Sequence, residues 1–335
     1  MQGLRQDIMP LSRRDMLRTS VAAALTVTGS TVYAADPPLA AFLPAPPVSQ
    51  FKVGDFTVTK VLDVDGIRLP ASDAVPKEYF TNNLDWLAPQ HYDARAHYIL
   101  LSIHVYVIQT RDKIIVVDPG LGDNKARVVA GHQEFNRQGG PWLYNFANAG
   151  FKPDNVNAVV STHLHGDHIG YNTVLKDGRW IPTFPNARYY LSKIDAEAMG
   201  QPNKSGGYSQ DFVESIKPVI DAGRAELVAG EVTIAEGVNL VPIPGHTPGH
   251  YSVHITSKGK RAIFTGDLWH SPLEIMYPRM PSLDRDPVPA QEARIKFFDE
   301  YADKDVLIVP AHHNHPSIGH IVKVPGRGRM FRMLG

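Results

Sequence analysis

Four side chains that can bind a metal ion lie within six positions of the chain. Residues 162–170 read THLHGDHIG, and the four are His163, His165, Asp167 and His168. Residues 158–162 just before them are apolar and β-branched, which predicts a strand. On an extended continuation of that strand, His163 and His165 point to the same side because they are two residues apart. Neutral imidazoles and carboxylates bind Zn, Mn and Fe, so the spacing predicts a divalent metal site.

The composition limits what else could bind that metal. The 335-residue chain has no cysteine, which excludes disulfides, thiolate nucleophiles and Cys-based zinc sites. Its 34 basic residues equal its 34 acidic residues, so no net charge favours nucleic acid or an anionic membrane. We therefore expect His and Asp or Glu ligands, a small-molecule substrate and no nucleic-acid partner.

The motif H-x-H-x-D-H at 163–168 resembles the signature of the metallo-β-lactamase-fold hydrolases. Other motifs typical of that family follow the same order along the chain: VVDPG at 116–120, GHTPGH at 245–250, TGD at 265–267 and VPAH at 309–312. The resemblance covers roughly residues 53–325. It implies an α/β fold, the αββα sandwich of two mixed β-sheets flanked by helices.

The resemblance also implies a binuclear centre, with Zn as the favoured metal and Mn, Fe or Co as alternatives. The implied ligands of one cation are His163, His165 and His246. Those of the other are Asp167, His168 and His312, with Asp267 bridging the two cations. His313 is the alternative to His312, which we favour because it directly follows Pro310 and Ala311. Asp118 would buttress the site, and His250 would support it from outside the ligand set.

This centre predicts metal-assisted hydrolysis. Two cations about 3.5–4 Å apart share a water molecule and lower its pKa, which generates a bridging hydroxide. Asp167 or Asp267 could accept a proton during turnover. Bacterial lactonases commonly place a tyrosine three residues after the bridging aspartate, where this chain has His270. A histidine could still donate a hydrogen bond there, so Asp167, Asp267 and His270 are the candidate catalytic residues.

Within the family, the chain resembles the exported subgroup that contains methyl parathion hydrolase, together with the quorum-quenching lactonases. PSIGHI at 316–321 and the long segment after Asp267 carry this resemblance. It implies a small neutral ester substrate: an organophosphate triester, an aryl ester or a lactone. The candidate pocket residues are Tyr171, Trp269, His270, Met276 and Tyr277, with ordinary core packing as the alternative for each.

Three other functions remain open at this point. One is hydrolytic displacement of another leaving group, such as an aryl halide. The second is a sulfur dioxygenase of the same fold with a single iron, bound by His163, His165, His246 and Asp267. The third is a metal-binding module without catalysis.

The N-terminus predicts export. Residues 12–18 (SRRDMLR), a weakly apolar stretch at 19–32 and VYAA at 32–35 resemble a twin-arginine signal peptide. We expect residues 1–35 to be this signal, the export machinery to be a partner and the mature protein to be periplasmic. The stretch is too short for a membrane span of about 20 residues, so we expect no stable membrane anchoring. A homodimer is compatible with the sequence.

The remaining elements must position the motifs. Residues 36–50 are proline-rich and predict an extended lead-in, followed by the hydrolase domain at 51–335. Alternating or β-branched runs predict strands at 56–62, 104–109, 113–117, 158–162, 188–191, 238–243, 252–256, 261–265 and 306–309. Helices are expected around 124–149 and 290–302. Residues 70–98 fit neither period, and they are either a lid that faces the substrate or a surface loop that packs its own aromatic residues.

Overall fold

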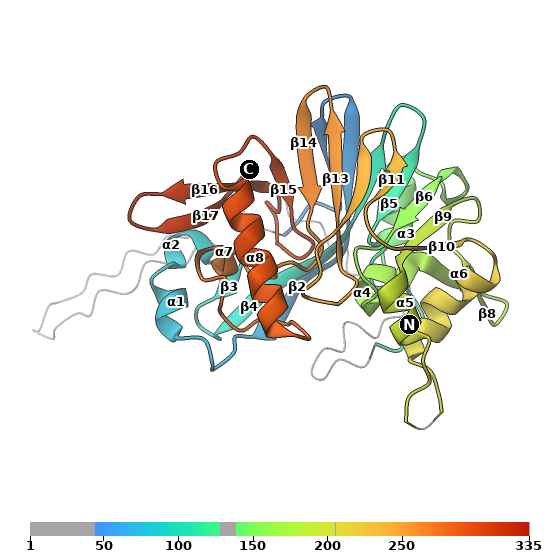
Figure 1. Cartoon of the computed structure of the whole chain (residues 1–335), viewed down its shortest axis with the longest axis horizontal. Coiled ribbons are helices and arrows are strands. Elements are labelled where there is room, and N and C mark those ends of the chain that lie inside the picture. The colour runs from blue at the N-terminus through green and yellow to red at the C-terminus, as the bar shows by residue number, and fades with distance from the viewer. Residues whose placement is uncertain (1–43, 128–138, 205, 335) are drawn as a thin grey trace, which may run out of the picture. The chain divides into compact units, whose positions relative to one another are not determined.

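The computed structural model describes residues 44–127, 139–204 and 206–334 (Figure 1). All of them belong to one compact unit, Ala40–Gly335. The expected signal peptide and residues 36–43 of the expected lead-in lie outside the described residues. Across the described residues, no helix combines the length and hydrophobicity that a membrane span needs.

The first sheet is antiparallel at one end and parallel at the other. Its strands, in spatial order, are β1 (Val48–Val53), β2 (Phe56–Pro70), β4 (Tyr98–Gln109), β5 (Ile114–Val117), β6 (Ala158–Val160), β9 (Arg188–Ser192) and β10 (Ala225–Val228), and β3 (Tyr92–Asp93) pairs with β4. Strands β5, β6, β9 and β10 run parallel to one another. The carboxyl ends of β5 and β6 therefore meet at one edge.

The second sheet is antiparallel except for one pair. Its strands, in spatial order, are β11 (Val232–Ala235), β12 (Val238–Pro242), β13 (Tyr251–Ser257), β14 (Lys260–Phe264), β15 (Leu307–Val309), β16 (Gly319–Val324) and β17 (Gly328–Met333). Strands β14 and β15 are parallel, so their carboxyl ends also lie together. A separate hairpin joins β7 (Thr173–Lys176) to β8 (Arg179–Pro182).

Short helices predominate among the described residues. The α-helices are α1 (Lys77–Thr81), α2 (Leu84–Leu87), α3 (Trp142–Asn148), α4 (Gly166–Ile169), α5 (Lys193–Met199), α6 (Lys217–Asp221), α7 (Leu273–Met276) and α8 (Pro287–Tyr301). Single turns of other helix types are η3 (Pro153–Asn155), η4 (Gly170–Asn172) and η5 (Phe212–Ile216).

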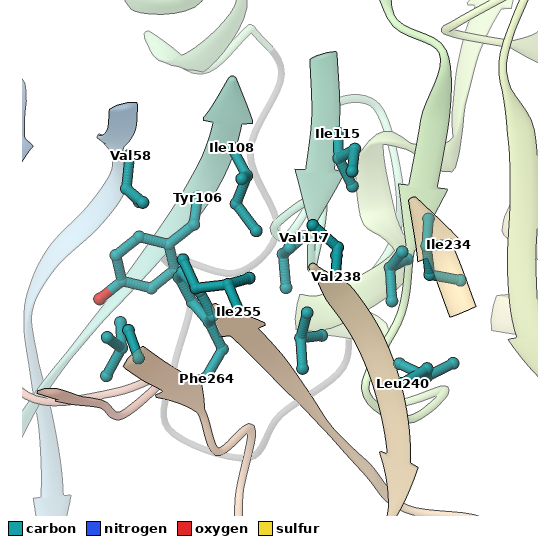
Figure 2. Packing of buried hydrophobic residues seen from close by; sticks show 14 of the residues in the cluster. Val58, Tyr106, Ile108, Ile115, Val117, Ile234, Val238, Leu240, Ile255 and Phe264 are labelled. Atoms are coloured by element: carbon teal, nitrogen blue, oxygen red, sulfur yellow. The ribbon is translucent and has the colours of Figure 1, made fainter. Parts of the chain in front are cut away.

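The two sheets pack face to face through one apolar core, part of which Figure 2 shows. Strand β5 explains how: Ile115 and Val117 face this core, whereas Val116 faces the opposite side of the sheet. Successive side chains of a strand point to opposite faces, so a strand covered on both sides is apolar throughout. Val238 and Phe264 of the second sheet complete the contact.

Helices cover the outer face of each sheet. Trp142 and Phe146 of α3 pack with Val116 on the first sheet. Phe297 and Phe298 of α8 pack on the outer side of the second sheet. The order is therefore helix, sheet, sheet, helix, which confirms the predicted αββα sandwich of two mixed sheets.

Each predicted strand overlaps an observed one, but several boundaries differ: β2 runs on to Pro70 and β4 already begins at Tyr98. Strand β1 begins at Val48, so the last three residues of the expected lead-in pair with β2. The helix expected over 124–149 is wrong in its first part. Residues 124–127 are not helical, Asn124 has a φ of 59°, and residues 128–138 lie outside the described residues. The helix that forms, α3, begins after Gly139, Gly140 and Pro141, which do not favour a helix interior.

The aromatic side chains of residues 70–98 pack on one another, as the second interpretation predicts, whereas Pro70, Ser72 and Val75 line a small cavity beside His270. Phe80 is buried and stacks on Tyr92 with ring centroids 4.7 Å apart, and His97 meets the edge of the Phe80 ring. Tyr79 stacks on Tyr277 at 3.7 Å, which fastens α1 to the segment that follows α7. The segment is thus a packed subdomain that buttresses β4 and α7.

Candidate metal centre

The predicted ligands converge from strand ends. His163, His165, Asp167 and His168 follow β6 and enter α4, and the other three follow β12, β14 and β15. Gly170, which follows α4, makes this turn possible, because a Cβ there would lie 1.9 Å from the carbonyl carbon of Leu121. Its N–H donates to the Gly120 carbonyl at 2.7 Å, which ties the motif to the segment after β5.

Three imidazole nitrogens converge on one point. His163 Nε2 lies 2.9 Å from His165 Nδ1, which lies 3.0 Å from His246 Nε2. A neutral imidazole has one N–H and one lone pair, so three such nitrogens cannot all be satisfied by one another. A cation that accepts three lone pairs removes the conflict. The structure therefore brings together the first predicted ligand group.

The second group lies beside the first. His168 Nε2 is 3.2 Å from His312 Nε2, and Asp167 Oδ2 is 3.5 Å from the same His312 nitrogen. Two groups could each hold a metal ion: one of His163, His165, His246 and Asp267, and one of Asp167, His168 and His312.

Asp267 lies between the two groups. Its Oδ1 is 3.1 Å from His312 Nε2 and 3.3 Å from His168 Nε2. Its Oδ2 is 3.5 Å from His246 Nε2. One carboxylate thus faces both nitrogen clusters, which is the arrangement that a bridging ligand requires.

Neighbouring groups fix the orientation of the ligands. Asp118 Oδ2 lies 3.1 Å from His168 Nδ1, and Asp118 Oδ1 accepts from the Thr162 N–H at 2.7 Å. His312 Nδ1 lies 3.0 Å from the Ser102 carbonyl oxygen, so its N–H points away from the centre. Such partners set the tautomer and the ring angle of a metal-binding histidine. Asp118 buttresses the site, as expected.

His250 also supports the centre from outside. Burial lowers the pKa of His250 to about 3, so its Nε2 remains an acceptor. That nitrogen accepts the Asp267 backbone N–H at 3.0 Å. His250 therefore positions the residue that lies between the two groups.

The electrostatics divide the histidines into two kinds. Burial lowers the pKa of His163 well below its ordinary value and that of His165 to about 4. Burial also disfavours protonation of His168, but the carboxylates of Asp267, Asp167 and Asp118 outweigh it and raise its pKa well above the ordinary value. The same competition raises the pKa of His312. The second group therefore has the negative surroundings that a cation compensates.

A buried ion cluster, which the sequence analysis missed, supports the first group. Asp284 Oδ1 lies 3.5 Å from His246 Nδ1, and Asp284 Oδ2 accepts from Arg294 NH1 at 2.8 Å. The same guanidinium nitrogen lies 3.3 Å from Glu274 Oε2. Glu274 Oε1 accepts the backbone N–H of His270 at 3.0 Å. No local pattern marks the ion cluster, because Arg294 is ten positions from Asp284 and twenty from Glu274 along the chain.

The structure places His312, and not His313, at the centre. Trp269 Nε1–H donates to His313 Nε2 at 2.9 Å, and the His313 ring packs beside Phe331. Burial lowers the pKa of His313 well below its ordinary value, which suits a neutral acceptor. Adjacent residues of an extended segment point to opposite sides, so only one of the two can face the ligands.

Only one of the candidate pocket residues lines the cavity over the centre. That residue is His270, whose Nε2 lies 3.2 Å from Asp267 Oδ2. Tyr171 is buried and stacks on Trp142, and Trp269 packs against Phe298, so both are core residues. Met276 and Tyr277 line a different cavity, beside α1. Core packing or other surfaces therefore account for these four side chains.

The cavity over the centre has a volume of about 570 Å³. One wall is apolar and consists of Ile67, Leu69, Leu101, Ile103, Leu121 and Leu283. The lining also contains Gln210 and the ion pair of Arg127 and Asp211, which the sequence analysis did not identify. A neutral molecule with an apolar part fits this lining better than a strongly charged one.

Comparison with known proteins agrees with this geometry. Residues 98–313 match the model of the metallo-beta-lactamase superfamily. The chain belongs to this superfamily. The match spans β4 to His313, and therefore includes every predicted ligand.

Relatives within the superfamily are distant. An N-acyl homoserine lactonase of Bacillus cereus is 26% identical over 183 residues, which cover 50% of this chain and 64% of the lactonase. A probable metallo-hydrolase of Mycobacterium tuberculosis is 26% identical over 244 residues, which cover 64% of this chain and 75% of that protein. The chain thus matches less than two thirds of the length of the Bacillus lactonase.

Solved structures share the fold. The hydrolase AbOPH, of the beta lactamase superfamily, superposes with a TM-score of 0.71 at 23% identity, over 88% of this chain and 99% of that one. The dizinc quorum-quenching lactonase AidC, in complex with a product, gives a TM-score of 0.68 at 22% identity, over 86% and 97%. These similarities establish the architecture, in which the two groups of His and Asp could each hold a metal ion.

Proposed function

We propose that the chain hydrolyses a small neutral ester with the help of two divalent cations, of which Zn is favoured over Mn, Fe and Co. The organophosphate triesters, aryl esters and lactones are the substrate classes that fit. The position of Asp267 carries this proposal, because one buried carboxylate faces both nitrogen groups. The lactonase relatives and the dizinc structural neighbour support it.

Two bound cations would activate a water molecule near neutral pH and polarise the ester oxygen. The residues of the chain would do the rest. Asp167 lines the cavity and its side chain is 30% exposed, so it can take a proton from the reacting water and pass it to solvent. His270 lies beside Asp267 and can donate a hydrogen bond to the substrate oxygen.

The walls of the cavity account for the preference for a neutral substrate. Arg127 is paired with Asp211, so its charge is compensated within the protein. Much of the remaining lining consists of leucine and isoleucine side chains. Apart from the proposed cations, the lining offers a charged phosphodiester backbone no Lys or Arg other than the paired Arg127.

The test is a hydrolysis panel on protein whose metal content is measured. We expect two cations per chain and turnover of at least one of a paraoxon-like triester, acyl lactones and p-nitrophenyl esters. Asp267→Asn should lose metal from both positions and abolish turnover. A single iron per chain with oxidation of a persulfide would favour a sulfur dioxygenase instead. Bound metal without turnover of any activated ester would contradict hydrolysis.

We also propose that the protein is exported to the periplasm in folded form. The proposal rests on the paired arginines and the small-residue segment of residues 12–35, which lie outside the described residues. Replacing Arg13 and Arg14 together by lysine should block export. A normal periplasmic yield of that variant, in a strain with intact twin-arginine transport, would contradict it.

A further inference from the structure

A second, smaller cavity adjoins the cavity over the centre. It has a volume of about 120 Å³. Leu69, Leu101, His270 and Leu283 line both cavities, so the two share one boundary. Beyond that boundary the lining is mostly apolar and includes Val75, Ile99 and Met280. We call it the side cavity.

His270 forms the boundary between the side cavity and the predicted ligands. On one side of the ring, His270 Nε2 lies 3.2 Å from Asp267 Oδ2, one of the predicted ligands. On the other side, His270 Nδ1 lies 3.1 Å from the Oγ of Ser282, a residue that lines the side cavity. The Glu274 carboxylate accepts the His270 backbone N–H, which holds the residue in place. A group that reacts beside His270 is therefore next to the side cavity.

Two buried apolar residues, Val75 and Met280, belong to the lining of the side cavity. Val75 is 2% exposed and Met280 is 5% exposed. Both belong to the cluster that Phe80 and Tyr92 build in the segment 70–98. A close-packed wall does not expand at small cost, so the size of the side cavity limits what it can bind.

We propose that the side cavity is a subsite for the acyl arm of the substrate, with room for a short alkyl chain. This inference rests on the proposed function, since it assumes an ester that reacts beside His270. An apolar cavity of about 150 Å³ binds benzene, and the side cavity is smaller, about 120 Å³, so it should bind an alkyl chain of fewer than about six carbon atoms. The leaving alcohol occupies the larger cavity. His165 lines that cavity and is exposed to solvent, so the alcohol can depart on that side.

The experiment compares p-nitrophenyl esters of acetic, butanoic, hexanoic and decanoic acids on metal-loaded protein. Each buried methylene should raise kcat/KM about fourfold, so that the butanoyl ester exceeds the acetyl ester about sixteenfold. The decanoyl ester should gain nothing over the hexanoyl ester. Val75→Phe and Met280→Trp fill the side cavity independently, and each should bring the butanoyl-to-acetyl ratio close to one.

The control is Ala293→Met, which adds bulk in a separate cavity between β12 and α8. It should keep the dependence on chain length. A flat series in the wild type, or a rise that survives both Val75→Phe and Met280→Trp, overturns the subsite while the proposed hydrolysis stands.

A second readout does not need turnover. The affinities of acetate, butanoate and hexanoate for metal-loaded protein, measured by calorimetry, should rise with chain length and lose this rise in both variants. If that pattern is found but no ester is hydrolysed, the subsite stands and the proposed function falls. If affinity is independent of chain length in the wild type, the subsite is refuted.

Discussion

Replacing Arg294 by methionine is expected to destabilise the protein strongly. The guanidinium is fully buried and lies between Asp284 and Glu274, whose side chains are 1% and 2% exposed. Methionine approximates the length of the arginine stem but leaves two carboxylates buried without their cation. Breaking a buried ion pair by removing one partner costs about 3–5 kcal/mol.

That loss should be visible in urea or thermal unfolding of metal-free protein at neutral pH. For domains of 150–250 residues, 1 kcal/mol changes Tm by roughly 2–4 °C, so Tm should fall by at least about 6 °C. Combining Arg294→Met with Asp284→Asn and Glu274→Gln removes the unpaired charges. The triple variant should therefore recover most of the lost stability.

The same substitution should weaken metal binding. Arg294 holds Asp284, and Asp284 lies beside His246 Nδ1. Losing the residue that orients a metal-binding histidine typically lowers the metal affinity tenfold to a hundredfold. Competition with a chelator measures this loss. Only the cation that His246 contacts should be affected.

The matched control is Arg68→Met. Arg68 donates to Asp93 at 2.6 Å, but its side chain is 51% exposed, so this pair should contribute at most about 1 kcal/mol. If Arg294→Met and Arg68→Met lose similar amounts of stability, the buried ion cluster does not have the role assigned to it.

Two further outcomes follow from the contacts. His312→Ala should remove one cation per chain and most of the activity. His313→Ala should keep both cations but lose stability, because it loses the hydrogen bond from Trp269. If His313→Ala loses the cation and His312→Ala keeps it, His313 is the ligand. Burial lowers the pKa of Lys60 from 10.5 to about 8. Between these two pH values the unfolded state binds more protons than the folded state. The free energy of unfolding should therefore rise with pH across that window. Lys60→Met should flatten this rise in urea unfolding, and an unchanged slope would contradict the assignment to Lys60.

Local sequence was sufficient to predict much of the site. His163, His165, Asp167 and His168 are held together by the chain itself, because a strand end and one helical turn fix their spacing. The central strands of both sheets were also predictable, since a strand covered on both faces, such as β5, is apolar throughout. The more peripheral strands β10, β11, β16 and β17 were not predicted. The helix expected at 124–149 was wrong over residues 124–127, where Asn124 adopts a left-handed backbone, and it formed as α3 over Trp142–Asn148.

The sequence by itself determined the kinds of ligand and the reaction they suit. The lack of cysteine left only imidazole and carboxylate donors, whatever the fold. Tertiary structure alone decided which of two adjacent histidines faces the centre, because the Trp269 N–H that occupies His313 comes from a distant segment. It alone brought Arg294 to Asp284 and lined the side cavity with Val75 and Met280. Such contacts depend on how layers pack, and no spacing along one strand or helix encodes them.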